Sequence, residues 1–210
     1  MNAPISPMNV PKTLLQMAGA SNEPAPLSES VVVVIDAQNE YVEGRLPLAN
    51  VEPALDQIAK LLTAARAAGA PIIHVVHRGR AGGLFDPLGK MFQIHPKAAP
   101  AAGEKIIEKE LPNAFAKTAL HLALQATERK SLVLAGFMTH MCVSATARAA
   151  LDHGWKTTVA GDAAATRDLP DPLGGMIPAS VVHRTALSEL ADRFAIVVKD
   201  TAALLPQQAA

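Results

Sequence analysis

Three side chains of complementary chemistry follow strand-like apolar runs in this chain. Asp36, Lys109 and Cys142, the only cysteine, each come after the end of such a run. A carboxylate, an ammonium group and a thiol are the base, cation and nucleophile that catalysis by an activated cysteine needs. Taken singly, each residue type also has a structural interpretation. A free cysteine is often a small buried hydrophobe, an aspartate can cap a turn, and a lysine is usually solvated.

The segment around Cys142 predicts a turn between a strand and a helix. The apolar run 131–135 is typical of a strand, Gly136 interrupts it, and a helix is expected over 142–153. Near a helix N-terminus the first N–H groups and the helix dipole stabilise negative charge, so this position favours a thiolate. The thiol is therefore a candidate nucleophile, provided that a base and a cation lie beside it.

Strand-like and helix-like patterns alternate from residue 30 onward, which predicts an α/β fold. This alternation indicates a six-stranded parallel sheet with helices on both faces and right-handed crossovers. Ligands bind beyond the carboxyl ends of such strands, so Asp36, Lys109 and Cys142 are expected at one edge of the sheet. Strands are expected at 31–35, 71–76, 105–108, 131–135, 156–160 and 195–198, and helices at 51–68, 115–126, 142–153 and 178–192.

The rest of the chain predicts one domain with an N-terminal extension. Residues 1–28 are rich in Pro, Ser, Asn and Ala, which indicates a flexible tail or an arm on a neighbouring subunit. Residues 29–210 are interpreted as a single domain, because no repeat or linker divides them. The Gly- and Pro-rich stretch 78–103 is a long loop of the kind that usually carries function. Residues 162–177 are expected to be irregular.

Composition excludes several classes of partner. The formal net charge is zero and aromatic residues make up 3% of the chain, so we expect neither nucleic-acid binding nor membrane binding. A single cysteine excludes an internal disulfide framework and a multi-cysteine zinc site. No apolar run is long enough to span a membrane, and the first residues lack the pattern of a signal peptide. A cytoplasmic location is therefore predicted.

Four segments together resemble a known family of enzymes. They are Val33–Asn39, Lys109–Phe115, Gly136–Val143 and Gly161–Ala163, and their order and spacing fit across about residues 30–205. The chain is similar to the isochorismatase-like cysteine hydrolases, which include nicotinamidase and N-carbamoylsarcosine amidohydrolase. The Gly-x-x-Thr-x-x-Cys-Val pattern is the most specific of these matches. The resemblance implies a three-layer α/β/α fold of Rossmann-like topology.

The resemblance also implies roles for particular residues. Asp36, Lys109 and Cys142 correspond to the catalytic triad. A cis peptide bond is expected between Phe137 and Met138, which would direct the Met138 and Cys142 N–H groups at a developing oxyanion. The positions expected to contact substrate are Gln38, Tyr41, His77, Phe115 and Thr139.

Several of these positions have alternatives. Tyr41 and Phe115 could equally be core residues, and Gln38 could position Asp36 or the turn that follows it. On the last predicted helix, His183 is interpreted as a solvated histidine. Phe85, on the long loop, is a weaker candidate for contact with substrate.

No metal or other cofactor is expected. Nicotinamidases of this family carry an Asp-x-His metal motif, whereas this chain has His74-Val-Val-His77 without it. Alternate strand positions share a face, so His74 and His77 should point in opposite directions. His74 is interpreted as a packed strand residue and His77 as a polar contact near the substrate.

The predicted function is therefore a cysteine hydrolase. It would cleave a C–N bond of a small amide, carbamoyl compound or lactam through a thioester on Cys142. One alternative is an isochorismatase-type vinyl-ether hydrolase, whose chemistry relies on the aspartate and needs no thiol. Another is a non-catalytic domain that uses the thiol as a sensor. The expected partners are a small-molecule substrate and further copies of the chain, in a homodimer or homotetramer.

Overall fold

Six parallel strands form the central sheet of the protein, whose computed structural model describes residues 10–205. Their order across the sheet is β3-β2-β1-β4-β5-β8, and each neighbouring pair is parallel. This confirms the predicted α/β fold. The strands are β1 (Ser30–Ile35), β2 (Ile72–His77), β3 (Lys105–Lys109), β4 (Ser131–Phe137), β5 (Lys156–Ala165) and β8 (Ile196–Val198).

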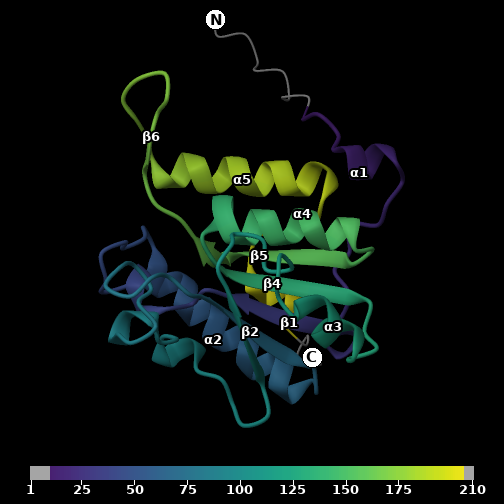
Figure 1. Ribbon diagram of the computed structural model, residues 1–210. Coiled ribbons are helices and arrows are strands. Elements are labelled where there is room, and N and C mark those ends of the chain that lie inside the picture. The colour runs from purple at the N-terminus through teal and green to yellow at the C-terminus, as the bar shows by residue number, and fades with distance from the viewer. Residues whose placement is uncertain (1–9, 206–210) are drawn as a thin grey trace, which may run out of the picture.

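Helices cover both faces of the sheet because its central strands are apolar on both sides. All six residues of β1 are buried, and alternate residues belong to two separate apolar clusters. Helix α2 (Val51–Ala67) covers one face. Helices α3 (Leu120–Gln125), α4 (Ser144–Asp152) and α5 (Ala179–Arg193) contribute to the cluster on the other face, and α4 and α5 lie opposite α2 (Figure 1).

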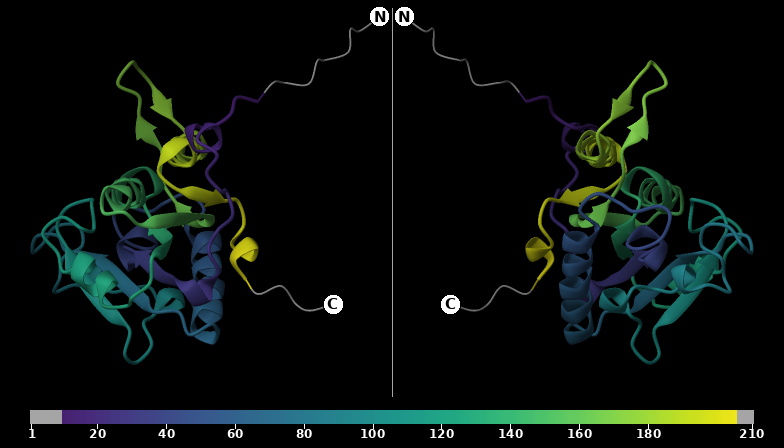
Figure 2. Two further views of the ribbon diagram at one scale, coloured as in Figure 1. Left: turned by 90° about the vertical axis from the view of Figure 1, so that its right-hand side faces the viewer. Right: turned by 90° about the vertical axis from the view of Figure 1, so that its left-hand side faces the viewer.

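Two segments differ from the sequence-based expectation. The helix expected over 115–126 begins only at Leu120, because Lys117 has a left-handed backbone with φ of 59°. The segment expected to be irregular, 162–177, continues β5 to Ala165 and then forms a hairpin of β6 (Leu169–Pro170) and β7 (Met176–Ile177). This hairpin extends beyond α5 (Figure 2).

The described part of the N-terminal extension lies on the same chain. The short helix α1 (Leu14–Met17) has a capping box, and its Leu14 N–H donates to Asp192 Oδ1 of α5 at 2.9 Å. A 3₁₀ turn, Leu27–Glu29, leads into β1. Residues 1–9 of the predicted tail lie outside the described residues, and an arm on a neighbouring subunit stays a prediction.

The stretch 78–103 is a long loop with two 3₁₀ turns, Lys90–Phe92 and Pro96–Ala98. An isolated bridge between Gln38 and Ile94 holds it against the end of β1. In the part of the chain from residue 10 to 205, none of the helices combines the length and apolar character needed to cross a membrane.

Candidate active site

The carboxyl ends of three strands bring Asp36, Lys109 and Cys142 into contact. Asp36 follows β1, Lys109 is the last residue of β3, and Cys142 lies in the turn after β4. Lys109 Nζ is 2.6 Å from Asp36 Oδ2 and 3.3 Å from Cys142 Sγ. The ammonium group therefore lies between the carboxylate and the thiol and contacts both.

All three residues are withdrawn from water. The exposed fraction is 0% for Asp36, 2% for Lys109 and 5% for Cys142. A buried charge is costly unless an opposite charge and hydrogen bonds compensate for it. Asp36 Oδ2 has that compensation, whereas Oδ1 has no hydrogen-bond partner among residues 10–205. The carboxylate thus keeps one oxygen available to accept a proton.

The surroundings of the Cys142 thiol favour its protonated form over the thiolate. Burial raises the pKa of Cys142 to about 12, and the nearby charge of Asp36 raises it further than Lys109 can lower it. Burial also raises the pKa of Asp36, against the opposing effect of Lys109. In addition, Cys142 lies in a π-helical turn, Thr139–Val143, that precedes α4, so it does not occupy the open first turn of an α-helix.

The turn before Cys142 has an unusual backbone. The peptide bond between Phe137 and Met138 is cis. Gly136 has φ of 115°, and a side chain there would collide with the backbone of Ile35, so only glycine fits. The N–H groups of Met141 and Val143 both donate to the carbonyl of Met138, at 3.0 and 3.2 Å. This turn carries the two N–H groups expected to form the oxyanion hole.

Two of the five expected substrate positions lie beside the triad. His77 Nδ1 is 3.4 Å from Lys109 Nζ, and burial followed by the charge of Lys109 lowers the pKa of His77 to about 4. His77 is therefore neutral near neutral pH. Burial raises the pKa of Tyr41, and the charge of Asp36 raises it further.

The rings of these two residues share a neighbour from the long loop. Phe85 makes edge contacts with Tyr41 and His77, with ring centroids 5.0 and 5.1 Å apart. The buried carboxylate of Glu40 accepts a hydrogen bond from the Phe85 N–H at 3.1 Å and from the Arg45 N–H at 2.7 Å. The loop is thus fixed where it borders the site.

The other three expected substrate positions are buried among protein groups, and a contact with substrate stays a prediction for each of them. Gln38 is fully buried, and its amide binds the backbone of His77 and of Phe92, so it ties β1 to β2 and to the long loop. Thr139 is also fully buried, and its hydroxyl lies 2.9 Å from His183 Nδ1. This contact also corrects the interpretation of His183 as a solvated side chain.

Phe115 packs against the end of α4. Its ring centroid lies 4.7 Å from that of His153, which follows the last residue of α4. Cys142 precedes α4, and at 1.5 Å per residue the two ends of this helix are on the order of 13 Å apart. Phe115 therefore packs between α3 and α4, and its ring centroid also lies 6.4 Å from that of His121 in α3.

Arg167 is a candidate that the sequence interpretation missed. It lies just beyond the end of β5. Its charge lowers the pKa of Tyr41, whereas burial and the charge of Asp36 raise that pKa. Its Nη1 donates to the Asp168 carbonyl at 3.1 Å, while its Nε is buried and has no partner in the described part of the chain. The small-residue run Gly161–Ala165 hid the true length of β5, and with it the position of Arg167.

The two histidines of β2 have different surroundings. His74 is 1% exposed and its Nε2 lies 2.9 Å from Glu104 Oε2, so it is the packed residue that was expected, whereas His77 faces Lys109. Between residues 10 and 205, no group of three or more His, Cys, Asp or Glu side chains is placed to hold a metal ion.

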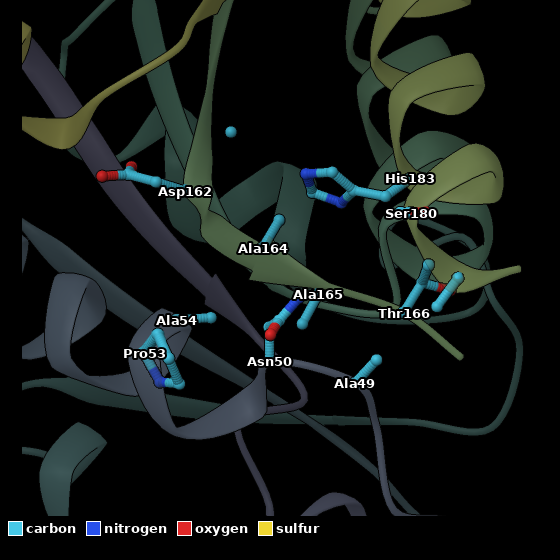
Figure 3. Close-up of a pocket in the computed structure, with 12 residues that line it drawn as sticks. Ala49, Asn50, Pro53, Ala54, Asp162, Ala164, Ala165, Thr166, Ser180 and His183 are labelled. Atoms are coloured by element: carbon cyan, nitrogen blue, oxygen red, sulfur yellow. The ribbon is translucent and has the colours of Figure 1, made fainter. Parts of the chain in front are cut away.

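A separate cavity lies further along the same edge of the sheet. Its volume is about 270 Å³, and it lies between the first turns of α2 and α5 and the end of β5 (Figure 3). The ring of His183 points into this cavity, and the triad residues do not line it. His183 therefore lies between the cavity and Thr139.

Comparison with known proteins places this arrangement in a family. The isochorismatase domain matches residues 30–202. A secreted isochorismatase effector from Verticillium dahliae is 41% identical over 183 residues, which cover 87% of this chain and 94% of that protein. A solved structure of an isochorismatase from Pseudomonas putida KT2440 superimposes with a TM-score of 0.89 and is 45% identical. The match covers 93% of this chain and 100% of that one.

The chain therefore belongs to the isochorismatase family. A streptothricin hydrolase from Streptomyces noursei is 32% identical over 173 residues, which cover 81% of this chain and 63% of that protein. Together these matches confirm that the protein is a hydrolase of this family. The predicted cytoplasmic location and the homo-oligomeric state stay predictions.

Proposed function

We propose that the protein is a cysteine hydrolase that cleaves the C–N bond of a small amide, carbamoyl compound or lactam. The observation that carries this proposal is the position of Lys109 Nζ, within 2.6 Å of the Asp36 carboxylate and 3.3 Å of the Cys142 sulfur. This is a base, a cation and a nucleophile in mutual contact. The similarity to a streptothricin hydrolase supports hydrolysis as the reaction.

The first half of the mechanism forms a thioester. Because the pKa of the Cys142 thiol is raised to about 12, the attacking sulfur still carries its proton. Asp36 takes this proton as the sulfur attacks the carbonyl carbon. Lys109 then faces a developing thiolate in place of a carboxylate, so the positive charge remains compensated. The N–H groups of Met138 and Cys142 bind the oxyanion. The protonated Asp36 gives its proton to the leaving nitrogen, and the C–N bond breaks.

The second half releases the acid. Asp36, again a carboxylate, takes a proton from water as the water oxygen attacks the thioester carbonyl. The C–S bond breaks, and the proton returns to the sulfur. His77, neutral because its pKa is lowered to about 4, contacts the substrate without competing for these protons.

The surroundings of the triad favour a substrate with an acidic group. Arg167 has a buried Nε without a partner in the described residues. Its charge lowers the pKa of Tyr41, which the charge of Asp36 raises. A carboxylate on the substrate would pair with Arg167 while its amide carbon lies at the sulfur. Phe85, Tyr41 and His77, whose rings contact one another through Phe85, would supply an aromatic wall for such a substrate.

The deciding experiment is a turnover screen of small amides, ureas and lactams with and without carboxylates. Ammonia release reports the primary amides and ureas, and the mass gain of one water reports the lactams. Cys142→Ala should lower turnover by about 10³-fold or more, whereas the exposed neighbour variant Met141→Ala should keep it. Full turnover by Cys142→Ala would contradict the thioester mechanism.

Vinyl-ether hydrolysis is the second candidate, favoured by the names of the isochorismatase relatives. It would use Asp36 as a proton donor, for which the raised pKa of this carboxyl is suited. The two activities separate in mutants. A vinyl-ether hydrolase retains turnover of isochorismate in Cys142→Ala and loses it in Asp36→Asn, whereas the amidase loses its turnover in both.

The proposal also includes a single catalytic domain over residues 29–210, a cytoplasmic location and a homodimer or homotetramer. The single domain rests on the lack of a repeat or linker, the location on composition and the pattern of the first residues, and the assembly on the family resemblance. Light scattering on the purified full chain measures the mass, and a monomer at micromolar concentration would contradict the expected assembly.

A further inference from the structure

A second cavity lies at the edge of the sheet opposite to the triad. It measures about 270 Å³ and lies where β5 and β8 begin, whereas the triad lies where strands end. Its walls come from the N-terminal segment 15–21, the end of α4, the end of α5 and the first residues of these two strands. The length of β4, seven residues at about 3.3 Å each, separates the two edges by on the order of 20 Å.

Two polar side chains that line this cavity are buried without a partner. Trp155 is 9% exposed and Thr157 is 3% exposed. Neither the Trp155 Nε1–H nor the Thr157 hydroxyl makes a hydrogen bond within residues 10–205. Buried polar groups in native proteins nearly always find a partner. Two unsatisfied donors of residues that line one cavity are therefore available to a ligand that reaches them.

The rest of the lining defines the chemistry of that ligand. Leu15, Leu151 and Ile196 make much of the wall apolar, and the exposed Lys156 and Arg193 lie at its rim. No salt bridge within the described residues engages either cation. An apolar body fits the wall, and an anionic acceptor fits the two donors and the rim.

We propose that this cavity is a binding site for a small monocarboxylic acid with an aryl or short alkyl body. The carboxylate accepts hydrogen bonds from Trp155 Nε1–H and from the Thr157 hydroxyl, and Lys156 and Arg193 provide the positive rim. Both donor atoms are covered in this arrangement, so the residues that line the cavity must move when the ligand binds. The site lies outside the catalytic edge and does not depend on the proposed amidase function.

Trp155 makes the test direct, because it is the only tryptophan in the chain. Phenylacetate and hexanoate are titrated against the full chain while Trp155 fluorescence is recorded, with 2-phenylethanol as the uncharged comparison. We expect a saturable change with the two acids and a much weaker one with the alcohol. Calorimetry on Trp155→Phe, which lacks the N–H donor, should show weaker binding of the same acids.

Thr157→Val is the critical variant, and Thr158→Val is its matched control. Thr157 and Thr158 are both buried, but successive strand residues face opposite sides of the sheet. The dissociation constant of phenylacetate should rise about tenfold or more in Thr157→Val and stay unchanged in Thr158→Val. Circular dichroism establishes that each variant is folded. If Thr157→Val does not fold, Arg193→Gln replaces it, with a weaker loss of binding expected.

Two further variants separate this site from the catalytic edge. Cys142→Ala and Arg167→Gln should bind phenylacetate as tightly as the unaltered chain. Loss of binding in either would place the acid at the catalytic edge and overturn the proposal. Equal binding by Thr157→Val, or no saturable response to either acid, would overturn it as well.

Discussion

The two edges of the sheet bury polar groups in opposite ways. At the carboxyl edge, Asp36 and Lys109 are full charges, and each compensates the other at 2.6 Å. At the amino edge, Trp155 and Thr157 are neutral donors without partners in the described chain. Paired charges fix one arrangement of catalytic groups, because removing either partner leaves an uncompensated charge. Unpaired neutral donors cost less, and they remain available to a ligand.

The largest effect should come from breaking the charge pair. Lys109→Met leaves the Asp36 carboxylate buried without its cation. We expect the free energy of unfolding to fall by about 3–5 kcal/mol near neutral pH and turnover to fall by about 10³-fold or more. Denaturant unfolding and the substrate screen measure the two losses.

The pH dependence of that variant sharpens the same point. Without Lys109, the pKa of Asp36 rises further, because the cation is what lowers it against the effect of burial. A protonated Asp36 is neutral, so the destabilisation should shrink as pH falls. The double variant Asp36→Asn/Lys109→Met should recover most of the stability and none of the turnover. A double variant as unstable as Lys109→Met would show that charge pairing is not the cause.

Asp36→Asn tests what holds the proton on the thiol. The Cys142 pKa is about 12 because of burial and then the charge of Asp36, while Lys109 acts in the opposite direction. Removing the carboxylate leaves the cation beside the sulfur, so the pKa of the thiol should fall. We expect alkylation by iodoacetamide at neutral pH to become more than tenfold faster, although turnover is lost. Slower alkylation would mean that Asp36 promotes the resting thiolate.

The strands and the triad were predictable because their signals are local. The buried β-branched run of β1 indicates a central strand, and the segments around Asp36, Lys109 and Cys142 carry both a chemical pattern and a place after a strand. Parallel strands bring such places to one edge. The α/β fold could thus be predicted from the hydrophobic periodicity of the sequence and from the rule for crossovers.

The errors occurred where tertiary packing decides. The late start of α3, at Leu120, follows from the left-handed turn at Lys117, which no local pattern announces. The length of β5 was hidden by small residues, Gly161–Ala165, that have weak strand preference. The protonation of Cys142 depends on burial and on Asp36, a residue far away in the sequence. Position near a helix N-terminus therefore does not by itself set the pKa of the thiol.

Two threonines give a matched comparison between the edges. Thr139 is buried and its hydroxyl binds His183, whereas Thr157 is buried with no partner in the described chain. Thr139→Val should cost about 1–2 kcal/mol, because a hydrogen bond is lost and the histidine nitrogen is left unpaired. Thr157→Val should be neutral or stabilise the fold by up to about 1 kcal/mol. Urea unfolding measures both changes in stability. Equal losses in the two variants would contradict the proposed difference between the two edges of the sheet.

The smallest effect concerns a cluster of paired charges at the start of β3. It lies at the same edge of the sheet as the cavity that contains the unpaired donors of Trp155 and Thr157. Glu104 binds Arg66 at 2.8 Å and His74 at 2.9 Å. The hydrogen bond from Arg66 is the main cause that lowers the pKa of Glu104 from 4.5 to about 2. Because the Arg66 side chain is 36% exposed, Glu104→Gln should cost about 1 kcal/mol or less.

The sign of its pH dependence follows from the lowered pKa. The unfolded chain binds a proton at this carboxyl before the folded chain does, so the stabilisation is complete above pH 4.5 and is lost as pH falls toward about 2. The stability difference between the unaltered chain and Glu104→Gln should shrink over that window in urea unfolding. Glu108→Gln, which alters the exposed pair with Arg78, should show almost no difference at any pH. A difference for Glu104→Gln that stays constant from neutral pH into the acid range would mean that its pairing, unlike that of Asp36, carries no charge dependence.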